Sequence, residues 1–114
     1  MIEMKLRNDP FEKIKNGKKT IEVRLYDDKR KDIKENDIIE FTNIETASKI
    51  RVKVIKLHLF DSFEELFNHF SYSCFGYNSR VEFDYRNMYE HYNKEEENKY
   101  GVVGIEIKLI KGDE

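Results

Sequence analysis

The sequence predicts an α+β fold built on a small curved sheet or barrel. Residue patterns typical of strands dominate both ends of the chain, and patterns typical of helices lie between them. The 114 residues, of which 39% are hydrophobic, suffice for one hydrophobic core but not for two. We therefore expect a single domain that spans residues 1–114.

The N-terminal part of the chain combines a strand signal with a helix signal. Met4 and Leu6, separated by polar residues, indicate a short first strand. A helix is expected to follow, because Asp9 is a preferred N-cap residue and Pro10 suits the first helical position. Gly17 suits the left-handed turn that ends such a helix.

Four further strands are predicted from the spacing of apolar residues. Alternation favours strands at 20–25, 38–42 and 49–57. Ile55 interrupts the last of these alternations, so a bulge is expected near it. The closing strand at 102–110 begins with a continuous apolar run, which predicts burial on both faces.

Two capping boxes predict two helices in the middle of the chain. Ser62 and Glu65 form the first box. It precedes an apolar stripe at helical spacing, made of Phe63, Leu66, Phe67 and Phe70. Ser79 and Glu82 form the second box, and the helix expected after it presents on one face Val81, Tyr85, Met88, Tyr89 and Tyr92.

Composition excludes several classes of protein. No apolar run approaches the roughly 20 residues that span a bilayer, and the N-terminus lacks a signal-peptide pattern, so a cytoplasmic protein without membrane contact is expected. The single Cys74 fits a reducing compartment and excludes an internal disulfide. Cys74 and the three histidines are too scattered for a metal-ligand spacing, so neither a metal nor another cofactor is expected. The sequence leaves the oligomeric state open.

The charge is unevenly distributed along the chain, although the net charge is only −2. Residues 1–58 hold 15 Lys and Arg against 11 Asp and Glu, whereas residues 59–114 hold 6 against 12. This asymmetry is compatible with a basic patch that meets phosphate. It does not locate the patch, because the two halves of a sequence intermix in a compact fold.

The segment 17–25 is the strongest functional lead. Lys18 and Lys19 lie in its basic turn, and Glu22 and Arg24 share the polar side of the strand that follows, opposite its apolar side chains. Arg24 offers a planar fork of donors for phosphate or a base edge, and Lys19 a compact positive charge. Glu22 has two interpretations: ion pairing or base recognition, and general base catalysis. The competing structural interpretation is a solvated sheet face.

A charged loop follows this strand. Tyr26 is a candidate to stack on a base, and Lys29 and Arg30 are candidates to contact the phosphate backbone. Neighbouring aspartates cancel much of the local charge, so an ordinary solvated loop is the alternative. The cations that alternate along 49–57 give only weak support for an RNA track.

Four motifs, in this order along the chain, resemble the ASCH domain, a family related to the PUA domain. They are GKKTIEVR at 17–24, IKENDIIEF at 33–41, SFEEL at 62–66 and YGVVGIEI at 100–107. The resemblance covers nearly the whole chain. It implies a PUA-like small β-barrel with flanking short helices, and a cleft lined by the Gly-Lys-Lys motif.

The resemblance also implies a function. Family members are generally expected to bind RNA or nucleotides, and one bacterial branch hydrolyses the acetyl amide of N4-acetylcytidine with a Lys of this motif, a Thr on the next strand and a Glu elsewhere. Lys19 matches that Lys, but Glu22 occupies the Thr position. The amidohydrolase constellation is therefore broken in this chain.

Three functional hypotheses follow. The first is a module that binds RNA or a modified nucleoside or nucleotide through a basic cleft, with candidate residues Lys18, Lys19, Glu22, Arg24, Tyr26, Lys29 and Arg30. The second is a hydrolase of the acetylcytidine type or a ribonuclease, in which Lys19 and Glu22 are catalytic. The third is a protein-interaction module that uses the acidic second half of the chain.

Overall fold

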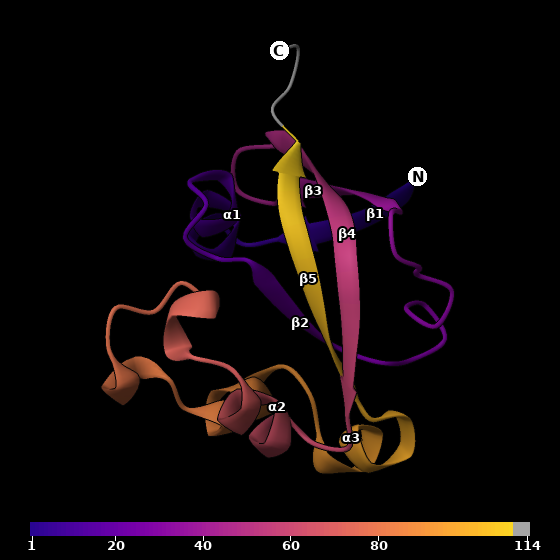
Figure 1. Ribbon diagram of the computed structural model, residues 1–114, viewed down its shortest axis with the longest axis vertical. Coiled ribbons are helices and arrows are strands. Elements are labelled where there is room, and N and C mark those ends of the chain that lie inside the picture. Colours follow the sequence, from indigo (N-terminus) through magenta and orange to yellow (C-terminus); the bar gives the residue numbers. More distant parts are fainter. Residues whose placement is uncertain (111–114) are drawn as a thin grey trace.

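The computed structural model describes residues 1–110, and Val81 only by its backbone. Its strands form one five-stranded sheet in the order β1-β3-β4-β5-β2 (Figure 1). The strands are β1 (Ile2–Leu6), β2 (Ile21–Leu25), β3 (Ile38–Asn43), β4 (Lys49–Phe60) and β5 (Val102–Ile110). β1 runs parallel to β3, and every other pairing is antiparallel.

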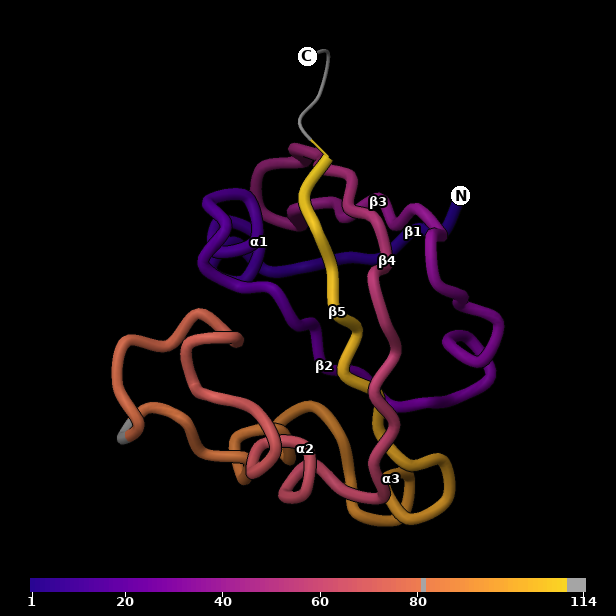
Figure 2. Tube along the Cα trace, in the orientation of Figure 1, coloured from indigo at the N-terminus to yellow at the C-terminus, as the bar shows by residue number. Residues whose placement is uncertain are grey.

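Three short α-helices and three 3-10 helices flank this sheet. The α-helices are α1 (Asn8–Lys15), α2 (Phe63–His69) and α3 (Lys94–Tyr100). The 3-10 helices are η1 (Tyr72–Cys74), η2 (Arg80–Glu82) and η3 (Tyr85–Glu90). The three 3-10 helices lie in the segment between α2 and α3. Figure 2 shows this segment as a wide loop that extends away from α2 and returns beneath the sheet to α3. None of the helices in residues 1–110 is long and apolar enough to cross a membrane.

The sheet curls into a half-barrel, so its two edge strands approach each other. The guanidinium of Arg24 on β2 donates a hydrogen bond of 3.0 Å to the main-chain carbonyl of Lys5 on β1, although these strands lie at opposite ends of the strand order. The predicted α+β class, with a small curled sheet and short flanking helices, is confirmed.

Apolar side chains pack on both faces of the sheet. One cluster lies on the concave face under α1, and its buried members include Leu6, Phe11, Ile14, Phe41, Val54, Val103 and Ile105. The second lies between β2, β5 and α2, and its buried members include Ile21, Val23, Leu25, Phe63, Leu66, Phe67 and Val102. β5 contributes to both clusters, which confirms the predicted burial of its first half on both faces.

β2 directs its charged side chains into the half-barrel, whereas an ordinary amphipathic strand would direct its apolar side chains there. Glu22 pairs with Ile105 and Arg24 with Val103, and neighbours in antiparallel register project to the same face. The charged side of β2 therefore faces the concave interior, while its apolar side packs under α2. Glu22 is only 3% exposed, so the interpretation as a solvated sheet face is wrong.

Two local predictions were confirmed and one boundary was displaced. The bulge in β4 lies between Val54 and Lys56, as expected. Gly17 has the predicted positive φ, 77°, after α1. However, the N-cap of α1 is Arg7 rather than Asp9, because the carboxylate of Glu45 from a remote loop accepts the Asn8 N–H at 2.7 Å. A side chain that is distant in sequence, Glu45, therefore satisfies a helix N–H group that a local N-cap was expected to satisfy.

The predicted second helix in the middle of the chain was wrong. The segment forms η2 and η3 instead, interrupted at Phe83, and Ser79 makes no side-chain capping bond. The rings of Phe83 and Phe67 are stacked, with their centres 4.5 Å apart and their planes at 6°. This contact holds Phe83 against Phe67, a position that a continuous α-helix would not give it. The helix predicted from the first box is confirmed as α2: Ser62 accepts the Glu65 N–H, but the Glu65 carboxylate accepts from the N–H of Asp61 rather than from that of Ser62. The acidic run before Tyr100 forms α3, a helix that the sequence reasoning missed.

Candidate functional site

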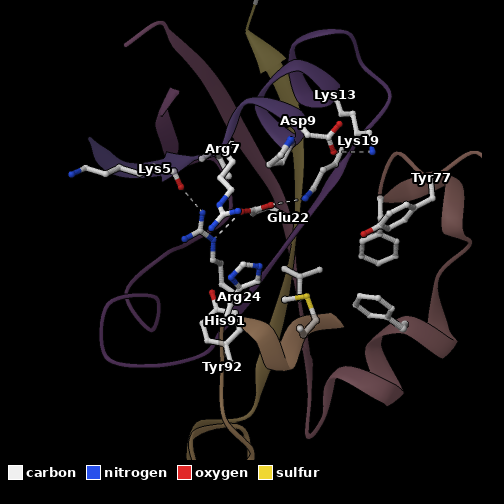
Figure 3. A pocket seen from close by; sticks show the side chains of 16 residues that line it. Lys5, Arg7, Asp9, Lys13, Lys19, Glu22, Arg24, Tyr77, His91 and Tyr92 are labelled. Carbon is white, nitrogen blue, oxygen red and sulfur yellow. Dashed lines mark hydrogen bonds and ion pairs between the residues drawn. The ribbon is translucent and has the colours of Figure 1, made fainter. Parts of the chain in front are cut away.

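A pocket of about 460 Å³ lies where the edge strands β1 and β2 approach each other. Four parts of the chain line it: the β1–α1 junction, the turn before β2 with β2 itself, the α2–η2 region, and η3 with the residues after it (Figure 3). Its size falls within the range of small-ligand sites in proteins.

Three charged side chains from one short segment meet in this pocket. Lys19 Nζ lies 2.8 Å from Oε1 of Glu22, and Arg24 Nε lies 2.8 Å from its Oε2. Figure 3 shows the two cations reaching the carboxylate from opposite sides. Glu22 is thus held between two positive charges, and its side chain is only 4% exposed.

The electrostatics keep this cluster ionised. Burial by itself raises the pKa of Glu22, but the charges of Lys19 and Arg24 and their hydrogen bonds outweigh it, so the pKa lies below its ordinary value. Burial lowers the pKa of Arg24, and Glu22 and the neighbouring phenol of Tyr92 more than offset this, leaving it raised. At neutral pH the cluster contains one carboxylate and two cations.

Cations outnumber anions around the pocket. The basic lining residues are Lys5, Arg7, Lys13, Lys19 and Arg24, and the acidic ones are Asp9 and Glu22. Asp9 is engaged by Lys13 at 3.0 Å. The side chain of Arg7 points toward Arg24 in Figure 3 and makes no ion pair with any other described residue. This side of the pocket therefore favours an anionic group.

The rest of the pocket lining is aromatic and apolar; Tyr77 lies away from Arg24, whereas His91 and Tyr92 lie beside it (Figure 3). This part of the lining includes Phe67, Phe75, Tyr77, Met88, His91 and Tyr92. The rings of Phe67 and Phe75 stack at 5.2 Å, and Tyr92 stacks on Phe63 at 5.6 Å, so these rings support one another. The pocket thus combines a cationic wall with a wall of rings, and the two walls adjoin each other.

Backbone contacts bring the two walls together. Lys19 forms an isolated antiparallel bridge with Phe75, and the Thr20 N–H donates to the Cys74 carbonyl at 2.9 Å. The Nζ of Lys13 lies 5.0 Å from the centre of the Tyr77 ring, over its face. The basic turn is therefore fixed against the aromatic loop.

A second buried glutamate ties the aromatic wall to the rest of the fold. Glu97 on α3 is 4% exposed; its carboxylate accepts the Phe63 N–H at the start of α2 and the Tyr89 hydroxyl of η3, both at 2.8 Å. η3 carries Met88, and Tyr92 is the second residue after its end. Glu97 therefore helps to hold the segment that supplies part of the pocket wall.

The structure brings together some of the residues that the sequence singled out. Lys19, Glu22 and Arg24 meet in the pocket, whereas Lys18 is exposed and does not line it. Tyr26 lines a different pocket of about 420 Å³, beside Tyr100.

The charged loop also lies outside the main pocket. Arg30 is paired with Asp27 at 2.9 Å, and Lys29 is exposed. Sequence reasoning missed the pocket residues Arg7, Lys13, Tyr77, His91 and Tyr92. No local signal marks them, because they come from segments that only the curled sheet brings together. In the described part of the chain, no group of three His, Cys, Asp or Glu side chains could hold a metal.

Comparison with known proteins places the chain in a family. The ASCH domain model matches residues 4–111. The crystal structure of the hypothetical protein PH0355 has 39% sequence identity and a TM-score of 0.83, and the match covers 95% of this chain and 97% of that one. Protein PF0455 from Pyrococcus furiosus has 37% identity and a TM-score of 0.75, with 96% and 97% covered.

A more distant match shows the fold alone. The ZmASCH protein from Zymomonas mobilis has 16% identity and a TM-score of 0.64, with 97% of this chain and 75% of that one covered. No curated protein matches the sequence. The family model and the two close structures show that this chain belongs to the ASCH domain family and has its PUA-like fold.

Proposed function

We propose that this protein binds single-stranded RNA and takes one nucleotide of it into the pocket at Glu22. The observation that carries the proposal is the combination of a cationic wall and an aromatic wall in one pocket of about 460 Å³. A nucleotide has the same two-sided character, with an anionic phosphate and a flat base. The resemblance to ASCH domains, for which RNA binding is generally expected, supports this assignment.

Each wall has a role in this proposal. Arg7 and Lys13 stand at the rim and carry charges suited to phosphate oxygens, with Arg7 able to present two parallel donors. The rings that line the pocket offer a surface on which a base can stack, and such stacking tolerates any base. The phosphate contacts supply salt-dependent affinity, whereas the side chains deeper in the pocket face the base.

The state of Glu22 favours binding over hydrolysis. A carboxylate with a lowered pKa is a weaker general base, and both oxygens of Glu22 are already engaged by Lys19 and Arg24. Glu22 also replaces the Thr of the amidohydrolase branch. Catalytic roles for Lys19 and Glu22 therefore have less support than a role in holding a ligand.

The deciding experiment measures the affinity for a labelled mixed-sequence single-stranded RNA over a salt series. Arg7→Ala should weaken binding at every salt concentration and reduce the slope of log affinity against log salt by roughly one, because one phosphate contact is lost. The matched control is Arg51→Ala. Arg51 is equally an exposed arginine, but it pairs with Glu40 on the outer face of the sheet.

Three results would contradict the proposal. They are no RNA retention at low salt, equal effects of the two variants, and release of acetate from N4-acetylcytidine or cleavage of the RNA that disappears in Lys19→Ala. The last result would make the protein a hydrolase. Retention of protein partners without RNA would instead favour an interaction module.

A further inference from the structure

Lys19, Glu22 and Arg24 form an ordered row of hydrogen-bonding groups in the pocket. The row runs from a donor (Lys19) through an acceptor (Glu22) to a donor (Arg24), with both neighbouring distances at 2.8 Å. Because the carboxylate is ionised, its oxygens act only as acceptors. The alternation donor, acceptor, donor is therefore fixed by charge.

The row has capacity left for a ligand. An ammonium carries three N–H groups and a guanidinium five, whereas a carboxylate has about four acceptor sites. Lys19 uses one donor on Glu22, and Arg24 uses its N–H groups toward Glu22 and the Lys5 carbonyl without exhausting them. Each Glu22 oxygen accepts one of these bonds and keeps a further acceptor site. All three side chains line the pocket.

A ligand that satisfies this row needs an acceptor, a donor and an acceptor in that order. We propose that the row recognises the imide edge of a uracil base, with the N3–H donated to Glu22 and the two flanking carbonyl oxygens accepting from Lys19 and Arg24. This inference rests on the proposed RNA binding and names the base that the pocket prefers.

The other RNA bases satisfy the row only in part. Among the four, uracil alone has one ring donor with a carbonyl acceptor on each side. Cytosine and adenine place a ring nitrogen acceptor at the centre of the edge, where it would face the Glu22 carboxylate. Guanine follows its N1–H with a second donor, which would face the cation of Arg24 or Lys19. Each mismatch leaves a buried polar group unpaired, and such groups dominate discrimination between similar ligands.

The test uses short fluorescein-labelled oligonucleotides of one base each, bound to the wild-type protein at a single low salt concentration. Oligouridylate should bind about tenfold or more tightly than oligocytidylate and oligoadenylate, the range expected when one base-specific pair is made or lost. An oligouridylate methylated at N3 should lose this advantage, because the donor to Glu22 is blocked. This probe requires no change in the protein.

A variant gives an independent readout. Glu22→Gln keeps the shape of the side chain but replaces one acceptor oxygen by a donor, so the preference for uridylate over cytidylate should fall about tenfold or more. Arg51→Ala, on the outer face of the sheet, should leave the preference unchanged. Thermal unfolding of each variant shows whether it is folded.

The outcomes separate this inference from the proposed function. If every oligonucleotide binds, but equally well, or if N3-methylation changes nothing, the assignment of uracil is wrong and RNA binding stands. If none is retained even at low salt, both fail. A preference for uridylate that survives N3-methylation would mean that the discrimination arises elsewhere in the pocket.

Discussion

Glu22 and Glu97 are both almost fully buried carboxylates, at 3% and 4% exposure, but the protein satisfies them in opposite ways. Glu22 lies between two cations that line a pocket. Glu97 accepts from a main-chain N–H and a tyrosine hydroxyl, and it pairs with no Lys, Arg or His in the part of the chain that the structure describes. The first arrangement belongs to the barrel mouth, the second to the helices beneath it.

The difference shows what each carboxylate is suited to do. The donors of Glu97 are uncharged and belong to two packed elements, α2 and η3, so their bonds mainly fix those elements in place. The partners of Glu22 are charged side chains with donors to spare, so the same contacts can be shared with a ligand. The following four predictions test this division between a structural and a ligand-binding glutamate.

The largest effect is expected from Glu97→Ala. It leaves the Phe63 N–H and the Tyr89 hydroxyl without their acceptor in a buried site, so the free energy of unfolding should fall by about 3 kcal/mol. Urea denaturation measures this. Glu96→Ala removes an exposed carboxylate from the same helix and should change stability by less than about 0.5 kcal/mol. Similar losses in both variants would refute the structural role of Glu97.

A smaller loss is expected from Arg24→Ala. Glu22 would keep Lys19 but lose its second cation, and the contact between the sheet edges would disappear, so the free energy of unfolding should fall by about 2 kcal/mol. RNA affinity should fall as well, because Arg24 lines the pocket. Arg51→Ala is the control in both measurements. An unchanged affinity in folded Arg24→Ala would separate the cluster from ligand binding.

Acid should weaken the Glu22 cluster without removing any side chain. Because the pKa of Glu22 is lower in the folded protein than its ordinary value of 4.5, the unfolded chain takes up the proton more readily. The stabilisation is complete above that ordinary value and is lost as the pH falls through the folded-state pKa.

Glu22→Gln has no such titration, so it provides the comparison. As the pH is lowered from neutral, the wild type should lose more unfolding free energy than Glu22→Gln does. The other carboxylates are common to both proteins, so this difference reports on Glu22. Chemical denaturation at a series of pH values measures it. A difference that stays constant through the acid range would mean that Glu22 is not held ionised by its neighbours.

The smallest effect is expected from Tyr89→Phe. Glu97 keeps its bond from the Phe63 N–H and loses one neutral donor, so the loss should be about 1 kcal/mol. Partial burial and the hydrogen bond to Glu97 raise the pKa of Tyr89 to about 12, so this donor persists into alkaline solution. Tyr85→Phe is the control, because the Tyr85 hydroxyl bonds no described residue. Equal stability of the two variants would show that the bond contributes nothing.

Much of the fold could be predicted because its signals are local. Apolar and polar residues alternate along a strand because successive side chains project to opposite faces. The bulge between Val54 and Lys56 could be predicted because it interrupts this alternation. The second box failed as a helix signal because Phe83 is anchored on Phe67, a residue of another element. The start of α1 was displaced by Glu45 for the same kind of reason.

The candidate site was predictable only in part. Lys19, Glu22 and Arg24 lie within one short segment, so their proximity followed from the chain itself. Arg7, Tyr77 and Tyr92 come from three other segments, and the contacts that bring them to the pocket depend on the curled sheet and on the aromatic loop docked against the basic turn. Nothing in their local sequence distinguishes them from surface or core residues.

The sequence by itself determined that Glu22 and Arg24 share one face of β2 and that the alternate residues share the other, because the pleat of a strand fixes this alternation. It did not determine which face is buried. Only the tertiary structure decided that α2 covers the apolar face, leaving the charged face to turn into the half-barrel. A buried carboxylate must find cations or donors, and the curl of the sheet placed Lys19, Arg24 and the opposite strand edge within reach.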